Sequence, residues 1–136
     1  MKTIFFGTPE TAVPFLRLLA RRAEVLAVVS QPDRPAGRGL GVSPTPVKAA
    51  ALELGLDVLQ PGKPADIAAE LKSLGADFGV VVAYGRILKT DVLSATRLGL
   101  LNAHFSLLPQ YRGAAPVQWS LVRGEAETGV TLFWLD

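Results

Sequence analysis

The stretch LLNAHFSLLPQYRGAAP, residues 100–116, contains the single histidine of the chain, His104, with Asn102 two positions before it. The apolar residues that lead into the pair indicate the end of a buried strand. Residues two apart on a strand project from one face, so the amide and the imidazole should point toward the same space. Pro109 breaks the strand pattern because proline cannot donate to a ladder. Side chains at the carboxyl end of a parallel strand lie where open α/β sheets bind ligands.

The remainder of the sequence alternates apolar, strand-like segments with helical ones. Strands are predicted at residues 3–6, 25–30, 57–59, 78–82, 98–102 and within 128–135, and helices at residues 9–22, 43–54, 65–74, 90–95 and 116–122. This alternation with short loops predicts an α/β fold, an open and mainly parallel twisted sheet with helices on both faces, as in Rossmann-like proteins. Trp119 is predicted to be a core residue of the last helix.

Composition restricts the class of protein. A chain of 136 residues, 49% of them hydrophobic, has room for one domain with a buried core. It contains no cysteine and one histidine, so we predict neither a disulfide nor a bound metal ion. It has no leader pattern and no apolar run of about eighteen residues, so we expect a cytoplasmic protein without a membrane partner. The net charge of +2 neither requires nor excludes a nucleic acid.

The segment QPDRPAGRG, residues 31–39, follows the second predicted strand. Its two prolines and two glycines predict an irregular loop. One interpretation is a flexible surface connection. Because the loop is long and carries Arg34 and Arg38, it could instead contact phosphates or RNA bases.

The segment AYGRIL, residues 83–88, follows the predicted strand at 78–82. Gly85 allows the backbone to approach a ligand closely or to adopt a positive φ. We interpret the segment as a wall for a flat heteroaromatic ring, and the alternative is a simple turn in which Tyr84 caps the core. Gly7, which ends the first strand, is a lone glycine. A dinucleotide-binding oxidoreductase is disfavoured because its three-glycine fingerprint is missing.

Several of these motifs together resemble one known family. Asn102 and His104, followed by SLLP at residues 106–109 and RGAAP at residues 112–116, are similar to the signature of the folate-dependent formyltransferases. The RGAAP motif and about the first forty residues are most similar to the members that act on methionyl-initiator tRNA. A lone histidine usually forms only a loop hydrogen bond, but ordered blocks over the whole chain favour the functional interpretation.

The resemblance implies an activity and its ligands. It implies transfer of a formyl group from 10-formyltetrahydrofolate to the amino group of methionyl-initiator tRNA in translation initiation, with no metal ion and no DNA. Residues 1–136 would form the amino-terminal formyltransferase domain, incomplete at its carboxyl end and without a carboxyl-terminal tRNA-binding domain. Two alternatives remain, an amino-sugar formyltransferase of the same family and a non-catalytic fragment that binds folate or tRNA.

The resemblance also implies roles for particular residues. Formyl transfer requires a donor to the oxyanion, a group that moves protons near neutral pH, and a carboxylate that orients this group. Asn102 matches the first role and His104 the second, and the carboxylate is expected just beyond Asp136. The implied folate-binding residues are Tyr84, Gly85, Arg86, Ile87, Leu88, Ser106, Leu107, Leu108 and Pro109, and the implied tRNA-binding residues are Arg34 and Arg38.

Overall fold

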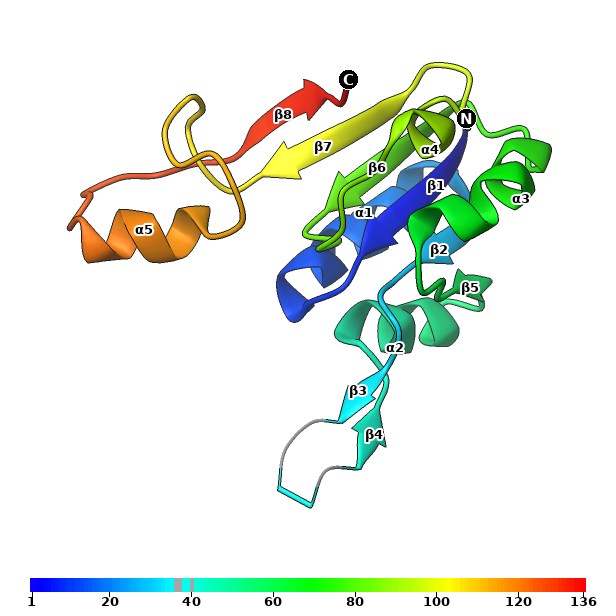
Figure 1. Cartoon of the computed structure of the whole chain (residues 1–136), viewed down its shortest axis with the longest axis horizontal. Coiled ribbons are helices and arrows are strands. Elements are labelled where there is room, and N and C mark those ends of the chain that lie inside the picture. The colour runs from blue at the N-terminus through cyan, green and yellow to red at the C-terminus, as the bar shows by residue number, and fades with distance from the viewer. Residues whose placement is uncertain (36–37, 40) are drawn as a thin grey trace.

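One six-stranded sheet forms the centre of the molecule. The computed structural model describes residues 1–35, 38–39 and 41–136. The strand order is β5-β2-β1-β6-β7-β8 (Figure 1). The strands are β1 (Lys2–Gly7), β2 (Glu24–Val29), β5 (Val58–Leu59), β6 (Phe78–Val82), β7 (Leu100–His104) and β8 (Thr131–Trp134). All neighbours pair in parallel except β7 and β8, so the predicted open, mainly parallel sheet is confirmed.

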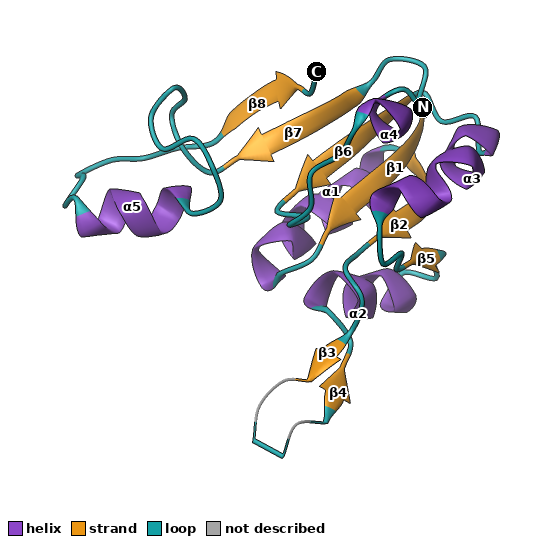
Figure 2. Cartoon of the chain, viewed as in Figure 1, coloured by secondary structure: helices purple, strands orange, loops and turns teal. Residues whose placement is uncertain are grey.

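Helices cover both faces of this sheet (Figure 2). The 3-10 helix η1 (Glu10–Ala12), α1 (Val13–Arg22) and α2 (Pro46–Glu53) pack on one face. The 3-10 helix η2 (Pro64–Ile67), α3 (Ala68–Ser73) and α4 (Thr90–Leu93) pack on the other. Alternation along β1 produces the two layers, because Phe5 joins the first core whereas Ile4 and Phe6 join the second. The predicted α/β, Rossmann-like architecture is therefore confirmed.

Element ends differ from the prediction where turns and caps decide them. β7 begins two residues later than predicted because a turn precedes it, in which the Thr96 hydroxyl donates to the Gly99 carbonyl at 2.8 Å and Gly99 has a φ of +98°. His104 consequently lies on the strand itself. α2 begins at Pro46 because the Thr45 side chain caps it, accepting from the Lys48 N–H at 3.1 Å.

Two predictions are wrong. Trp119 is 53% exposed because α5 (Pro116–Val122) stands away from the sheet and buries only Pro116 and Ser120 (Figure 1). The loop at residues 31–39 is not entirely irregular, since β3 (Arg34–Pro35) pairs antiparallel with β4 (Val42–Ser43) in an arm that projects from the body (Figure 1). Residues 36, 37 and 40, on which part of this prediction falls, lie outside the described residues.

The described residues show neither a membrane-spanning helix nor a metal-binding cluster. No helix in these ranges is long and apolar enough to cross a membrane. In the same ranges, no three His, Asp or Glu side chains come close enough together to hold a metal ion.

Candidate functional site

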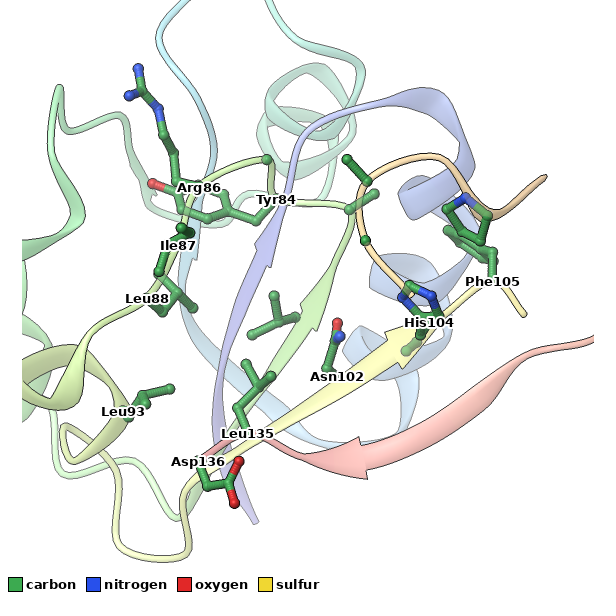
Figure 3. A pocket seen from close by; sticks show the side chains of 17 residues that line it. Tyr84, Arg86, Ile87, Leu88, Leu93, Asn102, His104, Phe105, Leu135 and Asp136 are labelled. Carbon is green, nitrogen blue, oxygen red and sulfur yellow. The ribbon is translucent and has the colours of Figure 1, made fainter. Parts of the chain in front are cut away.

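Asn102 and His104 stand at the carboxyl ends of the central strands. Asn102 pairs with Val81 of β6, and His104 is the last residue of β7. Both side chains lie on the same face of β7, as their spacing predicts (Figure 3). The pair therefore occupies the edge of the sheet at which open α/β folds bind ligands.

A first cavity, of about 670 Å³, opens beside the pair and has the size of a small-molecule site. It lies between the segment at residues 83–88, the end of β7 and the residues that follow β8. Its walls combine an apolar majority with a few polar groups (Figure 3). The apolar side chains include Val81, Ile87, Leu88, Leu93, Phe105 and Leu135, and the residues with polar side chains are Tyr84, Arg86, Asn102, His104 and Asp136.

A second cavity, of about 590 Å³, adjoins the same pair. Asn102, His104 and Gly113 line both cavities. The rest of the second cavity is lined by Leu108, Pro109, Arg112 and Phe133. One amide and one imidazole can therefore contact ligands in two adjoining spaces, an arrangement suited to moving a group between two bound molecules.

The two polar side chains of the pair differ in their hydrogen bonds. The amide of Asn102, which borders both cavities, makes no hydrogen bond to any described residue, so its N–H groups are free to donate to a ligand. The Nε2 atom of His104 lies 2.9 Å from the carbonyl oxygen of Tyr111. A carbonyl oxygen can only accept, so Nε2 carries the hydrogen, and Nδ1 is the acceptor in the neutral ring.

Asp136 lines the first cavity but lies far from His104. His104 pairs with Thr131 of β8, and Asp136 follows about 16 Å further along the extended chain. Figure 3 shows the Asp136 carboxylate beside Leu135, well separated from His104. Asp136 is therefore too far from His104 to orient its ring, and the carboxylate for that role stays a prediction.

A polar network holds the segment that follows β6. Ala83 and Gly85 have φ values of 49° and 90°, which turn the chain sharply. The Tyr84 carbonyl accepts from the Thr8 hydroxyl at 2.9 Å and from Gln31 Nε2 at 3.1 Å. The positive φ favours glycine at position 85, and a Cβ there would lie 2.4 Å from Gln31 Nε2, so the Gln31 side chain would have to move. The network occupies the crevice between β1 and β6, where the strand order reverses. The first cavity lies at the next pair of strands, β6 and β7.

The ring of Tyr84 belongs to the core. It is 2% exposed and packs edge-on against Phe6, with ring centroids 5.7 Å apart. Burial raises the pKa of the Tyr84 hydroxyl, which has no hydrogen-bond partner among the described residues. The Tyr84 side chain therefore lies in the core, as the second interpretation predicts. Ile87 and Leu88 leave apolar side chains along the cavity wall, and Ile87 is 87% exposed.

We expect Tyr84→Phe to raise the free energy of unfolding by about 1–3 kcal/mol, the cost of leaving a buried hydroxyl unpaired. The packing on Phe6 is kept, so urea denaturation of the two proteins measures the hydroxyl alone. Tyr111→Phe is the matched control, because the Tyr111 hydroxyl donates to Glu125 at 2.5 Å and its removal should give no gain. A less stable Y84F protein would show that the hydroxyl is hydrogen-bonded in solution.

Thr131 attaches the segment at residues 105–110 to β8. Its hydroxyl donates to the Ser106 carbonyl at 2.6 Å and accepts from the Leu108 N–H at 3.1 Å. Ser106 is fully buried and donates to the Gln110 carbonyl at 2.6 Å. Of the residues predicted to bind folate here, Leu108 and Pro109 line the second cavity, whereas Ser106 and Leu107 line neither of the two. The two predicted folate-binding segments thus face different cavities.

Arg34 and Arg38 are both exposed on the arm formed by β3 and β4. Neither lines the first or the second cavity. Arg34 donates to Gln31 Oε1 at 3.2 Å, and Arg86 donates to the same oxygen at 3.2 Å. Gln31 therefore links the arm to a wall of the first cavity.

Asp33 anchors the base of this arm. Its carboxylate accepts from Lys48 Nζ at 2.7 Å and from Gln60 Nε2 at 2.6 Å. The Lys48 ammonium, followed by the Gln60 amide, holds the pKa of Asp33 below its usual value. Because the folded-state pKa is lowered, the stabilisation is present above the ordinary pKa of aspartate and is lost as the pH falls through the lowered value.

Sequence reasoning missed several residues that build the site. Phe133 and Leu135 alternate along and just after β8, so a strict test for period-two alternation could have assigned them to one face. Gln31 and Thr131 had no such signal, since each reaches a segment more than twenty positions away in the sequence. Tyr111 acts on His104 through a main-chain carbonyl, which no residue type reveals.

Comparison with known sequences agrees with the resemblance carried by residues 100–116. The family model described as "Formyl transferase" matches residues 1–136. The chain is 60% identical over 136 residues to the methionyl-tRNA formyltransferase of Elusimicrobium minutum (strain Pei191), covering 100% of this chain and 41% of that protein. It is 55% identical over 138 residues to the enzyme of the same name from Sorangium cellulosum (strain So ce56), of which it covers 44%. The chain thus spans less than half the length of these relatives.

Comparison with solved structures gives the same fold. Glycinamide ribonucleotide transformylase 1 from Geobacillus kaustophilus aligns with 99% of this chain and 74% of its own, with a TM-score of 0.76 and 25% identity. A formyltetrahydrofolate deformylase from Pseudomonas syringae pv. tomato str. DC3000 has a TM-score of 0.75 over 99% of this chain and 46% of its own, and at 17% identity it shows the fold alone. With a family match over its whole length and a site between two cavities, this chain belongs to the formyl transferase family.

Proposed function

We propose that this chain is the formyl-transferring part of an enzyme that moves a formyl group from 10-formyltetrahydrofolate to the amino group of methionyl-initiator tRNA. The placement of Asn102 and His104 between two adjoining cavities carries the proposal, because a transfer needs donor and acceptor at one point. The names of the two sequence relatives support methionyl-tRNA as the acceptor. Such an enzyme would act in the cytoplasm, where protein synthesis begins.

The first cavity suits the formyl donor. Its volume matches a small-molecule ligand, and Ile87 offers exposed apolar surface that a heteroaromatic ring would cover. When bound, the donor supplies the formyl carbon at the end of the cavity bordered by Asn102 and His104. Leu108 and Pro109 would reach the donor across the junction of the two cavities, and Arg112 would face the acceptor.

Asn102 and His104 have separate tasks in this proposal. The free amide of Asn102 donates to the formyl oxygen as negative charge develops on it. The His104 ring, with Nε2 hydrogen-bonded to Tyr111, keeps Nδ1 available to accept a proton from the amine as it bonds to the formyl carbon. The same nitrogen would return a proton to the folate nitrogen when its bond to that carbon breaks. Both side chains are half-buried at the end of a rigid strand, so they are positioned before the ligands bind.

The direct test is a formylation assay with the full-length protein and 10-formyltetrahydrofolate. We expect product with methionyl-initiator tRNA and none with an amino-sugar nucleotide. Product with the sugar alone would favour the amino-sugar alternative. Binding of the donor without either product would favour the non-catalytic, folate-binding alternative.

Arg38→Ala should raise the KM for methionyl-initiator tRNA by about tenfold and leave the KM for the donor unchanged, because an exposed cation on the arm would contact phosphate. The salt dependence of tRNA binding should become shallower in the same variant. Arg22→Ala, which removes an exposed cation at the end of α1, is the matched control and should change neither constant. Equal losses for both substrates would indicate that the arm supports the core instead.

A further inference from the structure

His104 is held by a main-chain group whose position is itself constrained. The Nε2–H donates to the Tyr111 carbonyl at 2.9 Å. This bond fixes one tautomer of the neutral ring and leaves Nδ1 as the only proton acceptor. The proposed reaction requires an acceptor nitrogen in a defined place. Whatever holds the Tyr111 carbonyl therefore helps to set the chemistry of His104, beside the orienting carboxylate that the resemblance implies.

The backbone at Tyr111 has a conformation that residues other than glycine rarely adopt. Its φ is 55°, in the left-handed region. The preceding turn is closed by two hydrogen bonds, from Ser106 Oγ to the Gln110 carbonyl at 2.6 Å and from the Gln110 N–H to the Leu107 carbonyl at 3.1 Å. A tyrosine in this conformation needs contacts elsewhere to keep it there.

The side chain of Tyr111 supplies such contacts. Its hydroxyl donates to Glu125 Oε1 at 2.5 Å, and the Arg123 guanidinium lies 5.8 Å from the ring centroid. Both partners follow α5 in the sequence, and the RGAAP segment lies between Tyr111 and that helix. The hydrogen bond to Glu125 raises the pKa of Tyr111 above its ordinary value, so the phenol keeps its proton at neutral pH.

We propose that Tyr111 is a positioning residue for His104: Glu125 and Arg123 anchor its side chain, and the anchored residue holds its carbonyl where it fixes the Nε2–H tautomer. This inference rests on the proposed function, because it assigns a consequence for transfer to the geometry around His104. Tyr111 does not touch the reacting atoms, and its effect is expected in kcat rather than in the KM of either substrate.

The test is the tautomer of His104 in the full-length protein, read from the nitrogen chemical shifts of 15N-histidine, with the His104 signals assigned by their loss in His104→Ala. In the parent, the neutral form of the ring should carry its hydrogen on Nε2. Tyr111→Gly, which accepts the positive φ but removes the anchor, should show a mixture of tautomers. Its kcat should fall by about 10–100-fold with the donor KM unchanged. Tyr111→Phe, which loses only the bond to Glu125, should show a smaller shift in the same direction.

A purely structural role for Tyr111 predicts different results. In the His104→Ala background, Tyr111→Gly should add no further loss of kcat if it acts through His104, whereas a structural role would lower the rate again. Parent-like His104 signals in both Tyr111 variants would overturn the proposal. Should Tyr111→Gly fail to fold, Tyr111→Phe decides alone, and unchanged signals overturn the proposal. Leu121→Ala, at a side chain of α5 that is 74% exposed, is the control and should match the parent.

Discussion

Replacing His104 with alanine should lower the rate of formyl transfer by about 10²–10⁴-fold, the usual contribution of a positioned acid–base group. The ring borders both cavities, so it can reach an amine in one and a formyl group in the other. Its removal breaks one hydrogen bond, to Tyr111, and should lower the free energy of unfolding by about 0.5–1.5 kcal/mol. Single-turnover formylation and urea denaturation of the full-length protein measure the two effects separately.

Added imidazole provides the control for this prediction. The truncated side chain leaves space beside the cavities, so free imidazole should restore part of the rate in the H104A protein. It should restore none in the N102A protein, which keeps its own imidazole. The affinity for the donor should stay close to that of the parent protein. Parent-like turnover by folded H104A would remove His104 from the mechanism.

The sequence predicted the strands well wherever both faces are covered. The segment at residues 78–82 is a continuous apolar run, and β6 (Phe78–Val82) has those bounds because helices lie on both sides of it. The β7 strand was placed two residues too early, since the Thr96–Gly99 turn depends on a side-chain hydrogen bond that apolar periodicity does not register. The prediction that Trp119 is buried was wrong for another reason. Apolar residues in a helix form a core only when the helix packs on the sheet, and α5 stands away from it.

The candidate site was predictable only in part. The spacing of Asn102 and His104 placed them on one face because the side-chain period of a strand is fixed. The second cavity was not predictable, since it depends on Phe133 arriving beside Asn102 through antiparallel pairing of β8. The contacts through Gln31 and the Tyr111 carbonyl were likewise hidden, because they join segments that meet only in the folded chain. The sequence therefore placed the candidate pair at the site but did not show the residues that hold it.

Replacing Asn102 with alanine should lower the rate of transfer by about 10²–10³-fold, the loss typical of removing one oxyanion donor. Its amide makes no hydrogen bond to any described residue and borders both cavities, so its donor groups are available to a ligand. The substitution should change neither the hydrogen bonds within the chain nor the packing of the core, because Asn102 is only half-buried and belongs to neither core cluster. The unfolding free energy of the variant should therefore match that of the parent.

Asn102→Asp distinguishes donation from space filling. The carboxylate has the shape of the amide but no N–H, and it places negative charge where the oxyanion would develop. The loss of rate should therefore be at least as large as that of N102A, although less volume is removed. Gln118→Glu makes the same amide-to-carboxylate change at an exposed position of α5 and should leave the rate unaltered. If N102D transferred formyl groups at the parent rate, Asn102 would only shape the cavity, and the oxyanion donor would have to be sought among the main-chain N–H groups that border it.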